Sequence, residues 1–281
     1  RLDRPDPSRP SADMTVSGHW RIADNGLSIH GRINKLTINP SLLELATVLK
    51  SGTRTGPGDD NDRPQGTPPL DARDLAATGQ GNLAFRVTRW QPDTSWDYRL
   101  LLTLEHGQVK LPWLDGASRT LERLAGQIYL DPRHLQIRNL RGHEADTAVT
   151  VNGLVSRTAD PATGRLDVTL QAVLLDEQLR NNLPPEWQTL FDAYNPTGQI
   201  RLSTSLRPDG DGQWRPTDSV LTANGCRVRH TRFPYPLEQV TGTLTQQGSS
   251  RDLVVEVDAI AGGRPILFRG QVHNAGPAAS S

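Results

Sequence analysis

The sequence repeats a glycine-anchored pattern at a nearly constant distance. Four glycines of the first copy each have a counterpart 116 to 118 residues later: Gly81 with Gly198, Gly107 with Gly225, Gly126 with Gly242, and Gly153 with Gly270. Tandem β-units bury apolar surface against their neighbours and offer a long surface in place of a single cleft. We therefore predict that the two copies superpose, with Gly81 on Gly198 and Gly126 on Gly242.

Apolar and polar residues alternate along most of the chain, as in Leu83-Ala84-Phe85 and Val255-Glu256-Val257. A period of two gives each strand one apolar and one polar face, which is typical of antiparallel sheets. Clusters of Gly, Pro and Asp separate these segments and predict turns. The predicted fold is mainly β: an elongated, curved antiparallel sheet (a β-taco or groove) built of repeated units, with two short helical insertions.

Two segments break the alternation and carry signals for the start of a helix. Asn39 precedes Pro40 and a leucine-rich run, and Asp176 precedes leucines spaced four residues apart. We predict helices at 40–50 and 176–194. The amphipathic stripe of the second helix could face a membrane, but we favour packing across the open side or end of the sheet.

These elements define the predicted domain organisation. Residues 15–154 form the first β repeat unit and residues 155–273 the second. A linker precedes them at 1–14 and a tail follows at 274–281. Residues 51–74 have almost no apolar content, which predicts a flexible loop inside the first unit.

The composition excludes several classes of protein. The 281 residues hold 31 basic and 31 acidic side chains, so no net charge points to nucleic acid as a partner. The single Cys226 cannot form an intrachain disulfide. No apolar run is long enough to span a bilayer as a helix. Because the sequence has no initial Met and no signal peptide, we expect a fragment whose membrane anchor lies outside it.

We predict no catalytic residue, no metal site and no cofactor, and hence not an enzyme. His143 with Glu144 and Asp146 could form a metal or acid–base site, but the corresponding turn at 261–265 has none of these residues, so we interpret the cluster as a solvated hairpin. Residues 59–62 are acidic but lack the spacing of a calcium loop. No nucleotide-binding or hydrolase motif occurs.

Three segments, in this order, resemble parts of bacterial AsmA-like proteins, a family related to TamB, YhdP and the bridge-like lipid transfer proteins. They are 135–143 followed by 148–153, 174–187 followed by 195–200, and 233–244, of which the last holds a Pro-x-Pro-Leu-x-x-Val-x-Gly strand entry. The resemblance implies a taco-shaped sheet in the periplasm whose apolar trough carries phospholipids between the inner and outer membranes. It also implies a phospholipid or other acyl-chain lipid as partner, and anchoring to the inner membrane through an N-terminal helix absent from this fragment.

The leading hypothesis is a non-enzymatic segment of an AsmA-like cell-envelope protein that binds acyl chains in an apolar groove, for intermembrane phospholipid transport or outer-membrane homeostasis. The alternative is a structural or protein-binding β-scaffold of the envelope with a self-filled core. A third is a carbohydrate-active or adhesive β-solenoid that uses its tryptophans. The lipid hypothesis requires one continuous apolar face, for which strand parity selects thirteen residues: Leu83, Phe85, Leu100, Leu102, Val149, Val151, Val168, Leu170, Ile200, Leu202, Val255, Val257 and Phe268.

Overall fold

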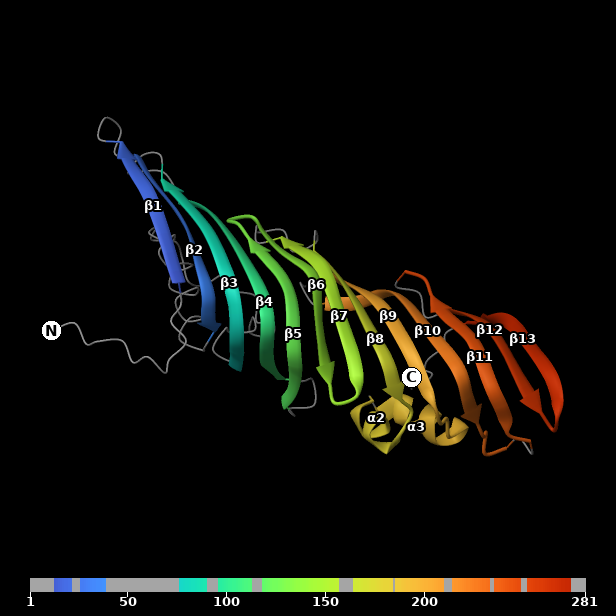
Figure 1. Ribbon diagram of the computed structural model, residues 1–281. Helices are drawn as coiled ribbons and strands as arrows, with labels where there is room; N and C mark the ends of the chain where they lie inside the picture. The colour runs from blue at the N-terminus through green and yellow to red at the C-terminus, as the bar shows by residue number, and fades with distance from the viewer. Residues whose placement is uncertain are drawn as a thin grey trace, which may run out of the picture. The chain divides into compact units, whose positions relative to one another are not determined.

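The computed structural model describes residues 13–21, 26–38, 76–89, 96–112, 118–156, 164–183, 185–209, 214–232, 235–248 and 252–273. As predicted, the protein is mainly β and antiparallel. The described residues form thirteen strands, which follow one another in the sheet in the order of the chain (Figure 1). The strands are β1 (Asp13–Arg21), β2 (Gly26–Ile38), β3 (Ala76–Arg89), β4 (Asp97–Pro112), β5 (Ser118–Leu130), β6 (His134–Glu144), β7 (Thr147–Ser156), β8 (Arg165–Leu174), β9 (Gln199–Pro208), β10 (Trp214–Val228), β11 (Leu237–Gln246), β12 (Leu253–Ala261) and β13 (Arg264–Val272).

The chain divides into two compact units. Unit 1 comprises residues 1–144 and 152–161, and unit 2 comprises residues 145–151 and 162–281. Strands β1 to β6 thus belong to unit 1 and β8 to β13 to unit 2, with the division inside β7. Every residue of β1 and β13, the first and last strands in the order, is exposed.

Two short helices, α2 (Glu177–Asn182) and α3 (Pro185–Tyr194), form the insertion predicted at 176–194. Asp176 caps α2 as expected, because its Oδ1 accepts a hydrogen bond from the Leu179 N–H at 2.8 Å. A proline opens α3, where the missing N–H costs nothing. The guanidinium of Arg180 pairs with both carboxylate oxygens of Asp192 and ties the two helices together. The predicted helix at 40–50 and the predicted loop at 51–74 lie outside the described residues.

The strand ladders of the two units repeat. The pair Leu83 and Leu102 of β3 and β4 corresponds to Leu202 and Leu221 of β9 and β10, 119 residues later on both strands. The register shifts recur as well. The ladder of β4 and β5 shifts on either side of Gly107, and the ladder of β10 and β11 shifts in the same way on either side of Cys226. The predicted repeat is therefore present at the level of hydrogen-bond register.

One of the two predicted glycine matches is confirmed and the other is wrong. Gly126 and Gly242 occupy equivalent positions, with φ of +151° and +142°. Gly81, however, corresponds to Ile200, and the true counterpart of Gly198 is Gly79. Both of these glycines have positive φ, and at both a Cβ would contact the backbone of the neighbouring strand. That close approach of two strands, which the sequence does not reveal, decides which glycine is equivalent.

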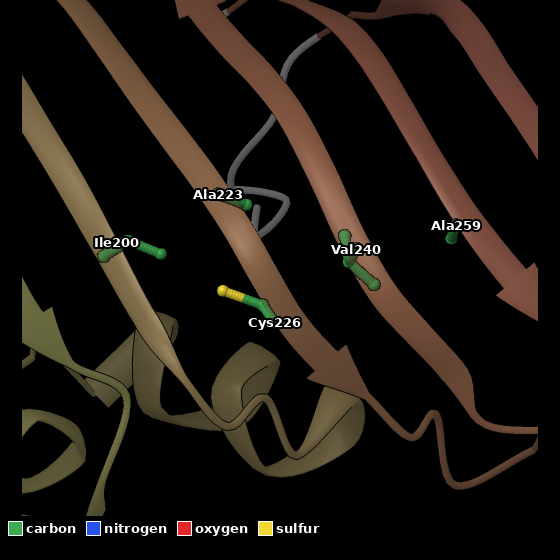
Figure 2. Close-up of a cluster of buried hydrophobic side chains, with 5 residues drawn as sticks. All are labelled: Ile200, Ala223, Cys226, Val240 and Ala259. Atoms are coloured by element: carbon green, nitrogen blue, oxygen red, sulfur yellow. The ribbon is translucent and has the colours of Figure 1, made fainter.

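The buried core of unit 2 is a narrow strip that crosses four strands. It consists of Ile200, Ala223, Cys226, Val240 and Ala259, one or two from each of β9 to β12 (Figure 2). The equivalent positions of unit 1 hold three glycines and two leucines: Gly81, Leu104, Gly107, Leu124 and Gly142. Leu124 is only 6% exposed, and its side chain fills the space that a Cβ of Gly142 would take. In each unit the buried residues therefore form a strip along a single sheet. They do not form a core between two packed layers.

Candidate functional site

The ladder registers show which of the predicted groove residues share a side of the sheet. In an antiparallel ladder, directly paired residues project to the same side and the next residues to the other side. In unit 1, Leu83 pairs with Leu102 and Phe85 with Leu100, so these four predicted residues lie together. The same rows continue onto the neighbouring strands through further apolar residues: Ile29, Ile33, Val87, Tyr98, Ile128, Leu130, Leu135 and Ile137.

Unit 2 has the same arrangement. One row runs from Leu170 through Leu202 and on to Val255, and a second runs from Ile200 to Val257 and Phe268. Val168 lies on this side too, two residues before Leu170. All seven residues that were predicted on β8, β9, β12 and β13 therefore project from one side of unit 2.

The remaining two predicted residues, Val149 and Val151, belong to β7. They are two residues apart on the strand and therefore project from the same side of it. Val149 is among the best-buried side chains of the described residues, at 7% exposure.

We refer to the side of each unit that carries these rows as the apolar side. Most of its large side chains are only half-buried, and exposure increases toward the ends of the strand order, where Trp20 is 65% and Phe268 is 59% exposed. Among the described residues no large side chain is fully buried, since none falls below 2% exposure. A sheet that was covered by a second layer would bury such residues almost completely. The described residues therefore leave the apolar side partly open.

The helices of unit 2 do not cover its apolar side. They lie beside the ends of β8 and β9, in the connection between these strands (Figure 1). Their contacts are with strand ends and connections: the Arg229 N–H donates to the Tyr194 carbonyl at 2.9 Å, and the Tyr194 ring packs edge-on against His230 at 4.8 Å. The insertion thus packs at the end of the sheet, one of the two positions that we favoured.

Away from the strand ends, the paired positions on the apolar side hold no charged residue; Arg89, Arg119 and Arg264 lie at or next to the end of a strand. The opposite side carries the charged and most of the polar residues, with one apolar row of Ala84, Leu101 and Tyr129. In unit 1, His30, Arg86 and Arg99 form one cross-strand row there, and all three are exposed. The two sides of unit 1 therefore differ sharply in character, as the alternation predicts.

An ion pair on the polar side of unit 2 shows how this side is stabilised. Asp167 accepts a hydrogen bond from Ser205 Oγ at 2.5 Å and pairs with Arg165 at 2.9 Å. Partial burial by itself would raise the pKa of Asp167. The hydrogen bonds from Ser205 and Arg165, together with the Arg165 charge, outweigh that effect and hold the pKa below its usual value.

One feature of the apolar side was missed at the level of sequence. Thr204, Ser219 and Gln246 form a cross-strand row on the apolar side of unit 2, between the leucine row of Leu202 and the outer row of Leu206. The hydroxyls of Thr204 and Ser219 are hydrogen-bonded to one another at 2.9 Å. The parity of Ile200 and Leu202 already places Thr204 on this side, so the signal was present. The partner residues were not, because the register of β10 and β11 is not visible in the sequence.

The structure also bears on the metal and acid–base sites that the sequence offered. The described residues contain no group of three or more His, Cys, Asp or Glu side chains that could hold a metal ion. The Nδ1 atom of His143 is buried without a hydrogen-bond partner, but the residue as a whole is half-buried. One shallow hollow beside His19 and Thr88 has a volume of about 10 Å³, enough for a single water molecule.

Two of the described tryptophans pack against neighbouring residues. The Trp96 ring lies under the guanidinium of Arg89, 5.4 Å from its Cζ, and the Trp214 ring packs beside Gly164. Trp90 and Trp113 lie outside the described residues. None of the helices in the part of the chain that the structure describes has the length and hydropathy of a membrane span.

Comparisons with known proteins do not identify a family for this chain. No protein-family model, no curated protein and no solved structure matches the chain. The likeness to AsmA-like proteins therefore stays a resemblance in three segments, and the functional argument depends on the two sides of the sheet.

Proposed function

We propose that this chain is a non-enzymatic segment of an AsmA-like cell-envelope protein that binds the acyl chains of phospholipids on the apolar side of its sheet. Its role would be intermembrane phospholipid transport or outer-membrane homeostasis. The observation that carries the proposal is the half-open apolar side in each unit, where Leu83, Phe85, Leu100 and Leu102 share one face without a covering layer among the described residues.

The physical chemistry of such a side suits an acyl chain. Each methylene that leaves water contributes about 0.8 kcal/mol when it is fully buried, and somewhat less on a half-open surface. An unpaired charge on this side would cost several kcal/mol, and the paired positions away from the strand ends hold none. Successive rows of Leu, Ile, Val and Phe give similar contacts at each step, so a chain held there meets no single deep minimum. Firm binding with easy sliding follows from these two properties.

The location and the partners of the protein belong to the same proposal. A phospholipid or another acyl-chain lipid is the ligand, and the polar side of the sheet faces water. The resemblance to AsmA-like proteins supports a periplasmic position with attachment to the inner membrane through a segment outside this chain. Neither the net charge of zero nor the apolar side suits nucleic acid.

The first experiment asks whether lipid binds at all. The 281-residue chain, purified without detergent, should carry lipid that is detectable by native mass spectrometry, and it should bind a lipid with a fluorescent acyl chain. A wild-type chain that takes up no lipid would leave the protein-binding β-scaffold as the better hypothesis.

Neighbouring residues on opposite sides of the sheet provide the matched test of the site. Leu102→Asp places a carboxylate on the apolar side, whereas Leu101→Asp places it on the polar side, because Leu101 pairs with Tyr129 and Ala84 on the other parity. The corresponding pair in unit 2 is Leu170→Asp with Thr169→Asp. The apolar-side variants should lose lipid binding while the polar-side variants keep it. Equal binding by the members of each pair would contradict the proposal.

A further inference from the structure

The polar row on the apolar side of unit 2 has no counterpart in unit 1. By ladder register, Thr204, Ser219 and Gln246 correspond to the wholly apolar Phe85, Leu100 and Leu130. All three polar residues are half-buried. Since the two units otherwise repeat their registers, this row is a specific difference between them and not a consequence of the fold.

The Thr204–Ser219 hydroxyl pair can form further hydrogen bonds on the apolar side. Each hydroxyl has one donor and two acceptor sites, and the bond between Thr204 Oγ1 and Ser219 Oγ uses only one of the two donors. The second donor needs an acceptor, because a hydroxyl that faces apolar material without one costs about 1–3 kcal/mol. The row lies between two apolar rows, so the acceptor that fits is an uncharged oxygen atom within a largely apolar molecule.

We propose that the Thr204–Ser219 pair binds an ester carbonyl of a glycerolipid whose acyl chain lies on the neighbouring leucine row. This inference rests on the proposed function and places the lipid on the sheet. The acyl chain extends along Leu202 and Leu221, and the ester carbonyl oxygen accepts a hydrogen bond from the hydroxyl pair. The row holds only uncharged polar groups, so it selects an ester and not a charged headgroup, which remains in water. Unit 1, with Phe85 and Leu100 at the same place, binds acyl chains without this selection.

The test compares a diester phosphatidylcholine with its diether analogue, which lacks the carbonyl oxygens. Each competes with a lipid that carries a fluorescent acyl chain for binding to the 281-residue chain. The wild type should prefer the diester by about fivefold, which corresponds to one net hydrogen bond of about 1 kcal/mol. The variant T204V/S219A removes both hydroxyls with little change in volume, and it should bind the two lipids equally while its affinity for the diether is unchanged.

The neighbouring pair of strands supplies a matched control. Thr169 and Ser203 form a second hydroxyl pair, 3.3 Å apart, on the polar side of β8 and β9. The variant T169V/S203A should keep the fivefold preference. If T204V/S219A fails to fold, Ser219→Ala alone removes one hydroxyl and should still lower the preference. A preference that persists in T204V/S219A, or is lost equally in T169V/S203A, overturns the inference, as does a wild type that binds both lipids equally. A chain that binds neither lipid overturns the proposed function itself.

Discussion

The backbone at Gly242 makes a strong prediction about stability. Its φ of +142° lies in a region that side-chain-bearing residues rarely adopt, which costs roughly 1–3 kcal/mol for alanine. A Cβ there would stand 2.1 Å from the carbonyl oxygen of Glu256 and 2.7 Å from the Cα of Val257. Both contacts are with backbone, so relief requires β11 and β12 to separate locally, at about 1 kcal/mol for each ladder hydrogen bond lost. We therefore expect Gly242→Ala to lower the free energy of unfolding of unit 2 by about 3 kcal/mol or more.

Gly270→Ala provides the matched control, because a Cβ at Gly270 has nothing within 4 Å. This substitution should change stability by about 0.5 kcal/mol or less, and could stabilise the strand through reduced freedom of the unfolded chain. Urea unfolding followed by far-UV circular dichroism, with hydrogen exchange of the β11 and β12 amides, measures both variants. If Gly242→Ala and Gly270→Ala are equally stable, the close approach of β11 and β12 is not the constraint that we infer.

Three further predictions concern single side chains. Cys226 is only 2% exposed, and its Sγ–H donates to the Gln199 carbonyl at 3.2 Å. The thiol should therefore resist alkylation in the native protein and react only as urea unfolds it. Fast labelling in buffer would contradict the burial of this strip. Asp176→Ala removes the cap of α2 and should cost about 1 kcal/mol, visible as faster exchange confined to α2 amides. Because the folded pKa of Asp167 is lowered from 3.8, its contribution to stability is complete above that value and is lost as the pH falls through the lower folded pKa. The stability of the wild type should therefore fall more steeply than that of Asp167→Asn in titrations below about pH 4, and parallel curves would contradict this.

The sequence was sufficient to predict the class of fold and the two faces of the strands. Alternation of two residues is a direct consequence of strand geometry, so Leu83 with Phe85 and Leu170 with Val168 could be assigned to shared sides without any register. The cap at Asp176 was equally accessible, since an aspartate before a leucine-spaced run has one common structural meaning.

The register between strands was not accessible in the same way. The repeat distance was correct to within a few residues, but Gly79-Gln80-Gly81 offers two glycines, and only the closeness of the neighbouring strand decides which one has positive φ. The shifts at Lys35 and Ala172 were invisible because ordinary residues adopt φ of +54° and +57° there. The Thr204–Ser219 row was missed for the same reason: each strand was assigned correctly, but the row exists only once the strands are aligned.

The sequential order of the strands has a consequence for how the protein reaches its folded state. Each strand pairs with its neighbours in the chain, so most ladders close short loops and the entropy of loop closure is small at each step. Sheets built from distant segments fold slowly, because many contacts must wait for long loops to close. Here one hairpin can form and serve as a template for the next, and growth can proceed in either direction within a unit. The folding rate should therefore be faster than that of Greek-key sheets with a similar number of strands.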